Sequence, residues 1–348
     1  MQVRRDVRLA DLTTLAVGGP IERLLEVDTA EELVAAVRDA DESGRPLLLL
    51  GGGSNVVAPD EGWPGDVVAV RTRGIARVGD RLTVQAGEDW DGLVARTVTE
   101  QLAGMEALSG IPGSTGATPV QNVGAYGQEV AQTITAVRVF DRAEKREQLL
   151  TPAECGFAYR DSRLKREPGR FVVLEVEFAL EAGPLSRPVG YAELARTLGV
   201  EIGERAPLAE VREAVLGLRR GKGMVWDPAD PDSRSAGSFF TNPIVPAERA
   251  VEGCPSWPAG EGQVKLSAAW LVQHAGYGRG TRDGRVGTSS RHSLALTTED
   301  GATASELLAF ADRIIATVRE NFGVTLDREP TAVLPGRAEW APEGSAQA

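Results

Sequence analysis

Two glycine-rich segments contain the residues of this chain best suited to hold a ligand. Residues 110–127 include five glycines and two prolines, so this run can form neither a regular helix nor a regular strand. The second segment, residues 51–55, directly follows four consecutive leucines. Glycine lets bare backbone approach a ligand, and successive backbone N–H groups can bind phosphate oxygens. The two segments therefore predict two contact regions on one dinucleotide.

Neither segment has the pattern of a common nucleotide-binding motif. No Gly-Lys-Ser or Gly-Lys-Thr follows them, which excludes a P-loop, and no Gly-x-Gly-x-x-Gly fingerprint opens a helix. A Rossmann site is therefore not supported. The alternative is that both segments are ordinary surface loops, but such loops are usually shorter and more charged.

Length, composition and charge limit the possible partners. A chain of 348 residues is long enough for about two or three domains. Its 42% hydrophobic and 25% charged residues are typical of a globular protein, and its net charge of −12 argues against nucleic acid or an anionic membrane as main partner. An anionic ligand would need a local group of basic residues. Only four of the 38 basic residues are lysines, Lys145, Lys165, Lys222 and Lys265. This bias is more typical of genome composition than of function, but it makes each lysine slightly more informative.

The few cysteines and histidines exclude several kinds of site. Cys155 and Cys254 form no Cys-x-x-Cys pair, so neither a disulfide framework nor a zinc site is indicated. The only histidines, His274 and His292, cannot build a multi-histidine metal centre, and we expect no metal. Residues 1–14 lack the apolar region of a signal peptide, and no apolar run approaches membrane-spanning length. We expect a cytoplasmic protein.

Local patterns predict an α+β fold that places the glycine segments after strands. Thr29 and Glu32 form a capping box that begins a helix, and Gly44 is a suitable C-terminal stop. Together with strands at 24–27 and 47–50, this helix predicts a βαβ unit. Further helices are expected at 91–101, 208–221, 267–275 and 303–322, and further strands at 67–70, 82–86, 135–140, 146–150, 171–180, 324–326 and 332–334.

Five motifs follow one another in a fixed order, at residues 51–55, 111–117, 119–127, 159–162 and 236–243. This ordered set resembles the UDP-N-acetylenolpyruvoylglucosamine reductase family, type I branch, from about Thr13 to Glu329. The resemblance implies an FAD-containing oxidoreductase of peptidoglycan precursor synthesis. NADPH would be the hydride donor and the enolpyruvyl ether of UDP-N-acetylglucosamine the acceptor. We expect non-covalent FAD, because neither glycine segment contains the histidine or cysteine that tethers flavin in related folds.

The same resemblance implies a domain layout. It predicts a vanillyl-alcohol-oxidase-like (PCMH-like) FAD-binding fold of class α+β, with a smaller C-terminal α+β substrate domain. Residues 1–70, completed by C-terminal strands within 324–335, would form the first FAD subdomain and residues 71–218 the second. Residues 219–323 would form the substrate domain and residues 336–348 a flexible tail. The working expectation is a monomer.

The resemblance assigns the chemistry to Arg160, Ser238 and Glu329. Hydride transfer to the enolpyruvyl methylene carbon leaves charge on the neighbouring carbon and the carboxylate, so the reaction needs a carboxylate clamp and an acid. Arg160 and Glu329 would form the clamp, and Ser238 would donate the proton. We hypothesise that Glu329 stays protonated, because burial and a nearby carboxylate both favour its neutral form. Taken alone, Ser238 could instead cap a loop, Arg160 could pair with Asp161 on the surface, and Glu329 could be a solvated charge.

The remaining implied contacts are to the cofactor and the substrate. Tyr191 resembles the mobile tyrosine that closes over substrate in the type I branch. His274 and Thr331 depart from the family pattern, which has a glutamine-type contact and a basic residue there. The cofactor contacts are Gly51, Gly52, Gly53, Ser54, Asn55, Gly113, Ser114, Gly116, Ala117, Pro119, Gln121, Asn122, Gly124 and Ala125. The substrate contacts are Tyr126, Tyr191, Arg219, Lys222, Asn242 and His274, and Lys265 is either a further cation for the diphosphate or a surface lysine.

Three other functions compete with this interpretation. A different flavin oxidoreductase of the same fold, such as a sugar-acid or alcohol oxidase, would not need Ser238. A serine hydrolase could use Ser238 and His292, but no Gly-x-Ser-x-Gly elbow surrounds the serine. A UDP-sugar binding module would not need two FAD-contacting segments. The colour of the purified protein separates the flavoenzymes from the other two.

Overall fold

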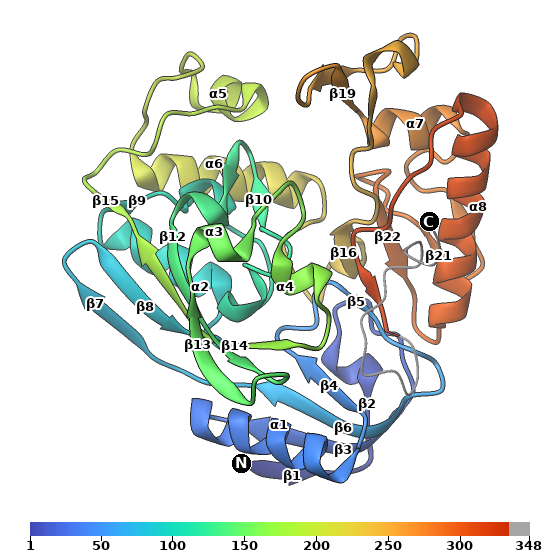
Figure 1. Ribbon diagram of the computed structural model, residues 1–348. Helices are drawn as coiled ribbons and strands as arrows, with labels where there is room; N and C mark the ends of the chain where they lie inside the picture. Colours follow the sequence, from blue (N-terminus) through green and yellow to red (C-terminus); the bar gives the residue numbers. More distant parts are fainter. Residues whose placement is uncertain (334–348) are drawn as a thin grey trace.

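The computed structural model describes residues 1–333, and its N-terminal part is a mixed sheet in the order β1-β3-β6-β4, with β2 added to β3 (Figure 1). Strands β3, β6 and β4 are parallel, and β1 and β2 are antiparallel to β3. Helix α1 connects β3 to β4, which confirms the predicted βαβ unit, and β6 lies between the two strands. The elements are β1 (Gln2–Arg4), β2 (Val7–Arg8), β3 (Pro20–Val27), α1 (Ala30–Ser43), β4 (Leu47–Leu50) and β6 (Trp63–Val70).

The boundaries of α1 follow from its sequence. The Thr29 side chain accepts a hydrogen bond from the Glu32 N–H (3.2 Å), and Gly44 ends the helix with a left-handed φ of 65°. Leu33 and Val37 are fully buried and lie in one core cluster with Phe140 of the second sheet. The helix therefore fixes the first sheet against the second, and the cavity described below opens beside this contact.

The second sheet is antiparallel throughout, in the order β13-β12-β14-β8-β7. Buried and half-buried residues alternate along β14, as expected for a strand with one face in the core. Near its end, Phe178 contacts Trp90 of α2 with ring centroids 6.2 Å apart. The elements are β7 (Ile75–Val78), β8 (Arg81–Gln85), α2 (Trp90–Thr99), β12 (Ile134–Asp141), β13 (Arg146–Leu150) and β14 (Phe171–Ala179).

Short elements around this sheet carry much of the site. The hairpin β10–β11 holds the end of the longer glycine segment, and α6 packs against α2 and α5, at the top of Figure 1. They are β5 (Val56–Val57), β9 (Leu102–Ala103), β10 (Gly124–Ala125), β11 (Gln128–Glu129), α3 (Pro152–Cys155), α4 (Arg163–Arg166), β15 (Glu181–Ala182), α5 (Ala192–Leu198) and α6 (Leu208–Gly221), with 3-10 turns at Leu9–Leu12, Glu106–Leu108, Thr115–Ala117 and Val130–Gln132.

The C-terminal part forms its own core around α8, where Phe310 and Ile314 pack with Phe239 and Phe240. Two small antiparallel sheets, β16-β22-β21-β20 and β17-β19-β18, flank this core. The elements are β16 (Ser235–Ser238), β17 (Ile244–Pro246), β18 (Ser256–Pro258), β19 (Gln263–Leu266), α7 (Ala268–His274), β20 (Arg282–Asp283), β21 (Val286–Thr288), β22 (Ala295–Thr298), α8 (Ala304–Phe322) and β23 (Thr331–Ala332), with 3-10 turns at Pro231–Ser233 and Ala247–Arg249.

The predicted strand at 324–326 is wrong. Val324 and Leu326 are buried because they pack into the core around α8, and their segment forms no ladder. The second predicted strand of this pair is present as β23, but its partner is β5, to which it is parallel. The predicted tail at 336–348 lies outside the described residues. The class α+β is confirmed.

The C-terminal part is tied to the first sheet by hydrogen bonds. Asp60, which precedes β6, accepts hydrogen bonds from the backbone N–H groups of Ala304 (2.7 Å) and Ser305 (2.9 Å) in the first turn of α8. Thr298 Oγ1 donates to the Leu15 carbonyl at 2.6 Å. Within residues 1–333, no helix combines the length and apolarity needed to cross a membrane.

Candidate active site

A cavity of about 850 Å³ lies where the three parts of the fold meet. Both glycine segments line it, as do the end of α6, strand β16 and the segment around Lys265. The structure brings together at this cavity the following predicted residues: Gly51, Gly52, Gly53, Ser54, Asn55, Gly113, Ser114, Gly116, Ala117, Gln121, Gly124, Ala125, Tyr126, Arg160, Tyr191, Arg219, Lys222, Ser238, Asn242 and Glu329.

The two glycine segments touch each other and form one wall. A Cβ atom added to Gly52 would lie 2.7 Å from the Gly113 Cα, which is too close for any side chain. Gly53 has a φ of 64°, and its Cβ would lie 2.0 Å from the Leu12 carbonyl oxygen. Ser54 Oγ donates to the Pro112 carbonyl at 3.0 Å. At Gly52 and Gly53 this wall offers backbone to a ligand, because side chains are excluded from these positions.

Basic side chains outnumber acidic ones in the lining of the cavity, although the overall charge of the chain is −12. In the part of the chain that the structure describes, two acidic residues line it, Glu129 and Glu329. Three of the four lysines of the chain are among the lining cations, whereas Lys145 lies exposed in a turn. The cations are Arg142, Arg160, Lys165, Arg219, Lys222 and Lys265. The cavity therefore suits a large ligand that carries several negative charges.

Arg160 and Glu329 form an ion pair at the cavity, with Arg160 Nε 3.1 Å from Glu329 Oε1. Arg160 has a left-handed φ of 54° and donates from Nη2 to the Gly124 carbonyl at 2.7 Å. Asp161 pairs with Arg166 instead. Burial raises the pKa of Glu329, and the charges of Arg160 and Lys165 only partly oppose that rise. Because its pKa is raised, the Glu329 carboxyl group keeps its proton to a higher pH than a free glutamate does.

Ser238 stands at the end of β16, half-buried and facing the same cavity. It pairs with Ala295 of β22, and the next two residues, Phe239 and Phe240, are fully buried. The Glu329 N–H donates to the Phe239 carbonyl at 2.9 Å, so the backbones of Ser238 and Glu329 are held close together. Ser238 thus lines the same cavity as the Arg160–Glu329 ion pair.

Tyr126, Tyr191 and Lys222 form a group at the cavity mouth. The two tyrosine rings are perpendicular, with centroids 5.5 Å apart, and the Lys222 Nζ lies 5.6 Å from the Tyr126 ring centroid. Tyr126 has a φ of 48°, and burial raises its pKa to about 12, so its hydroxyl stays protonated. Tyr191 is 44% exposed. Lys222 Nζ also donates to Glu193 Oε2 at 2.7 Å.

Arg219 is the most buried of the lining cations, at 9% exposure. Its Nη2 donates to the Met224 carbonyl at 2.8 Å, while its buried Nε has no hydrogen-bond partner among residues 1–333. Burial lowers the pKa of Arg219, with the nearby Tyr126 and Asp91 opposing that shift. A buried guanidinium with a free donor fits an anionic ligand group.

Asn242, Tyr159 and Lys265 line the cavity on the C-terminal side. Asn242 Oδ1 accepts from the Ala268 N–H at 2.9 Å, which anchors it at the start of α7. The Lys265 Nζ lies 4.5 Å from the ring centroid of Tyr159. Sequence reasoning left Lys265 undecided and missed Tyr159 as a ligand contact. The rarity of lysine in this chain was the one signal that favoured Lys265.

Three predicted contacts do not line the cavity. Pro119 is buried in the loop, and Asn122 points into the protein, where its Nδ2 donates to Glu129 Oε2 (2.8 Å) and to the Ala158 carbonyl (2.9 Å). His274 is exposed and stacks on Trp270 with centroids 3.7 Å apart. The register of α7 explains this position, because Leu271 and Val272 occupy its buried face. The structure therefore does not bring His274 together with the other predicted substrate contacts.

Other residues near the cavity were not expected as ligand contacts. His292 lines it, and burial together with the charge of Lys222 lowers the pKa of its imidazole to about 4. Trp226 and Trp257 line the cavity as large exposed aromatic residues. Thr331, one of the two departures noted in the sequence, also lines it, and its N–H donates to the Asn55 carbonyl at 3.0 Å.

Glu106 positions the two tyrosine-bearing segments from behind the cavity. This carboxylate is 1% exposed. Its Oε1 accepts from Gln128 Nε2 and from the Arg187 N–H, both at 2.8 Å, and its Oε2 accepts from the Gly104 N–H at 2.6 Å. Gln128 follows Tyr126 in the hairpin, and Arg187 precedes Tyr191. A lone glutamate in an apolar stretch gave no signal of this role in the sequence.

Comparisons with known proteins agree with this architecture. Residues 21–147 match the family model of an FAD binding domain, and residues 228–333 match that of the UDP-N-acetylenolpyruvoylglucosamine reductase C-terminal domain. The chain is 53% identical over 347 residues to the UDP-N-acetylenolpyruvoylglucosamine reductase of Thermobifida fusca (strain YX), covering 94% of this chain and 97% of the relative. It is 53% identical to that of Streptomyces coelicolor, covering 96% and 91%.

A solved structure is similar over almost the whole length. The crystal structure of UDP-N-acetylenolpyruvylglucosamine reductase from Thermus caldophilus matches with a TM-score of 0.69 and 28% identity, covering 96% of this chain and 100% of that chain. These findings confirm the predicted fold, a vanillyl-alcohol-oxidase-like FAD-binding part followed by a smaller C-terminal domain. On this evidence, the chain belongs to the UDP-N-acetylenolpyruvoylglucosamine reductase family.

Proposed function

We propose that this chain reduces the enolpyruvyl ether of UDP-N-acetylglucosamine to UDP-N-acetylmuramate, a step of peptidoglycan precursor synthesis. NADPH is the hydride donor, FAD is bound non-covalently, and the protein works in the cytoplasm as a monomer. The observation that carries the proposal is the meeting of Arg160, Glu329 and Ser238 in a cavity whose other wall is made of glycine backbone. Family membership supports the same reaction.

The residues of the glycine wall fit a bulky flavin nucleotide. A Cβ atom on Gly52 would lie 2.7 Å from the Gly113 Cα, and one on Gly51 would lie 2.3 Å from Ser114 Oγ, so both positions keep bare backbone at the cavity. Ser54, Asn55, Ser114 and Gln121 add polar groups, while Asn122 and Pro119 shape the segment from within. FAD, when bound, supplies the hydride that reaches the substrate. In the proposed domain layout, residues 1–70 and 71–218 hold it and residues 219–323 present the substrate.

The chemistry of the substrate end follows from the Arg160–Glu329 pair. The Arg160 guanidinium binds the substrate carboxylate and stabilises the negative charge that develops there. Glu329, whose pKa is raised by burial, can donate a hydrogen bond to the same group when it is protonated. A substrate carboxylate placed beside it would favour that protonated form further. Ser238 delivers its proton to the substrate carbon that lies between the carboxylate and the carbon that receives the hydride.

The diphosphate of the substrate finds its cations at the end of α6. Arg219 offers a buried donor, and Lys222 lies at the cavity mouth beside Tyr126. Tyr191 is exposed and can close over the bound substrate, with Asn242 contributing an amide on the opposite side. Lys265 joins these cations in our proposal, whereas His274 is left out of it because of its exposed position.

The experiment that tests the proposal separates the two half-reactions in Ser238→Ala. NADPH should bleach the flavin absorbance of this variant at the wild-type rate. Reoxidation by the enolpyruvyl substrate should slow by about 100-fold or more, the usual range for losing a general acid. Ser43→Ala, in the exposed last turn of α1, is the matched control and should behave as wild type. Colourless wild-type protein that takes up no FAD, or unchanged reoxidation in Ser238→Ala, would overturn it.

A further inference from the structure

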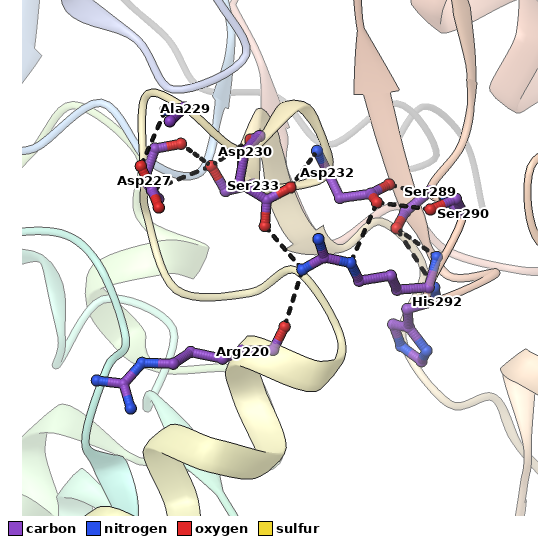
Figure 2. Close-up of polar contacts among 10 residues, drawn as sticks. Arg220, Asp227, Ala229, Asp230, Asp232, Ser233, Ser289, Ser290 and His292 are labelled. Atoms are coloured by element: carbon purple, nitrogen blue, oxygen red, sulfur yellow. Dashed lines mark hydrogen bonds and ion pairs between the residues drawn. The ribbon is translucent and has the colours of Figure 1, made fainter.

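An acidic loop, residues 227–233, lies between the end of α6 and the turn at 289–292 (Figure 2). The loop is closed on itself, because Ser233 Oγ donates to the Asp227 carbonyl (2.7 Å) and accepts from the Asp227 N–H (3.1 Å). We propose that two residues of this region, Asp232 and Arg291, are positioning residues that hold the substrate end of the cavity in shape. The kinetic part of this inference rests on the proposed function.

Asp232 joins the loop to both of its neighbours. Its Oδ1 accepts from the Ser290 N–H at 2.8 Å, and its Oδ2 accepts from Ser290 Oγ at 2.6 Å. On the other side it packs against Gly223, where an added Cβ would lie 2.7 Å from the Asp232 Cβ. Burial alone would raise the pKa of Asp232, but hydrogen bonds from Ser290 and Ser289 and the charge of Arg291 lower it overall. The carboxylate is therefore ionised at neutral pH.

Arg291, which belongs to the turn at 289–292, connects this turn to the acidic loop and to the end of α6. Its Nη1 donates to the Arg220 carbonyl in the last turn of α6 (3.1 Å) and to Asp230 Oδ2 (2.8 Å). Its Nε lies 3.4 Å from Asp232 Oδ2. A cation at a helix C-terminus satisfies free carbonyl groups and interacts favourably with the helix dipole. An exposed ion pair alone stabilises little, but here both carboxylates are largely buried, at 18% and 13% side-chain exposure.

Asp232 and Arg291 do not line the cavity, but the hydrogen-bond network that they form holds residues that do. Lys222 precedes Gly223, Ser233 leads into β16, and His292 follows Arg291. Ser289 Oγ accepts from the backbone N–H groups of Arg291 (3.0 Å) and His292 (3.3 Å), which fixes the turn. Figure 2 shows the imidazole of His292 directed away from Asp232 and Ser290. The network thus fixes the position of Lys222 relative to His292 at the cavity.

The imidazole of His292 reports on this separation. Burial is the main cause that lowers its pKa to about 4, followed by the charge of Lys222. Glu193 opposes the shift and Arg279 adds to it. Release of the turn from α6 would let water reach the ring and move Lys222 relative to it. A role confined to global stability would leave the environment of this ring unchanged in the folded protein.

The test compares Arg291→Met and Asp232→Asn holoenzyme with wild type by NMR of ¹⁵N-histidine between pH 5 and pH 7.5. The chain has two histidines, so His274→Gln assigns the remaining signal to His292. Wild-type His292 should stay neutral throughout this range. In both variants its pKa should rise from about 4 toward the ordinary value of about 6.5, so that the ring titrates within the range.

The kinetic arm measures KM and kcat for the enolpyruvyl substrate in the same proteins. We expect KM to rise about fivefold to tenfold with kcat within about twofold of wild type, because misplacement of binding groups acts on substrate binding. Arg291→Lys, which keeps the charge at the helix end, should recover part of the loss. Arg313→Met, which breaks the exposed pair with Asp283 in the same part of the protein, is the matched control and should change neither quantity.

Each outcome decides the inference. Variants that contain bound flavin but show the wild-type His292 titration, or an unchanged KM, overturn it. If Asp232→Asn does not fold, Arg291→Met, whose side chain is 42% exposed, answers the same question. Wild-type protein that never turns over the enolpyruvyl substrate refutes the proposed function instead, and the NMR comparison still tests the positioning role.

Discussion

The Lys222 ammonium group donates to a carboxylate oxygen of Glu193 at 2.7 Å, and Glu193 stands two residues after Tyr191 in the chain. The ion pair therefore connects the end of α6 to the segment that carries the exposed tyrosine. Any anion that binds Lys222 must compete with Glu193 for the same donor. The cavity mouth is thus partly neutralised before a substrate arrives.

Removal of this competition should strengthen substrate binding. In Glu193→Gln we expect KM for the UDP-sugar to fall by about twofold to fivefold at low salt, since partly exposed ion pairs contribute roughly 0.2–1 kcal/mol. The difference from wild type should shrink as salt screens the charges. Steady-state kinetics at two ionic strengths measure it. An unchanged or higher KM at low salt would show that Glu193 does not compete for Lys222.

The raised pKa of Glu329 predicts a pH dependence. Its neutral form is the one proposed to donate to the substrate, so reoxidation of the flavin by substrate should slow as the pH rises through this pKa. Glu329→Gln should flatten that part of the profile, whatever its absolute rate. Stopped-flow measurements between pH 5 and pH 9 test this, and a variant with the same slope as wild type would assign the dependence to another group.

The same shift has a consequence for folding. Because the folded-state pKa of Glu329 lies above its unfolded value, the stability it contributes is fully present below the unfolded pKa and is lost as pH rises through the folded pKa. Glu329→Gln should remove this component of the pH dependence of unfolding. Urea denaturation of flavin-free protein at several pH values measures it.

Gly52→Ala should separate the two glycine segments. The new Cβ would meet the Gly113 Cα at 2.7 Å, so the backbone must move. We expect FAD affinity to fall by at least about tenfold, because several backbone contacts depend on this wall. Gly217→Ala is the matched control, since nothing lies within 4 Å of its Cβ and α6 should gain up to roughly 1 kcal/mol. Flavin titration of the apoprotein distinguishes the two variants, and equal affinities would contradict the assignment.

Glu106→Gln should weaken the support of both tyrosine segments. A glutamine cannot accept with both ends of its amide, so at least one of the Gly104 and Arg187 N–H groups loses its partner. We expect a loss of about 1–3 kcal/mol in unfolding free energy and a raised KM for the UDP-sugar. Glu147→Gln, at an exposed position on β13, is the control. Unchanged stability would mean that the carboxylate is dispensable.

The sequence predicted those elements whose signals are local. The N-cap at Thr29, the capping box at Thr303 and the left-handed glycines at 44 and 323 determined α1 and α8, because caps act within one turn; Glu32, predicted to complete a capping box at Thr29, accepts from the Asp28 N–H instead. The strand predicted at 324–326 was wrong because Val324 and Leu326 are buried in a core, and burial in a core produces the same apolar pattern as burial in a sheet. The register of α7, which turns His274 outward, depends on tertiary packing.

The site was predictable only in part for the same reason. Arg160 and Glu329 meet through the long-range fold, so their association came from family resemblance and not from their own surroundings in sequence. Glu106 and Glu193 act through contacts with distant segments, for which a single sequence offers no pattern. The lysines were an exception, because their scarcity drew attention to three residues that all reach the cavity.

The backbone contact between the two glycine segments limits how this protein can diverge. Where Gly52 meets Gly113, the surface consists of main-chain atoms that offer selection no side chains to exchange, and an added Cβ on Gly52 would displace the Gly113 backbone. Changes in ligand preference must therefore accumulate across the cleft, among the aromatic and charged groups of the C-terminal half. An inhibitor anchored on the bare wall would accordingly leave resistance mutations few places to arise.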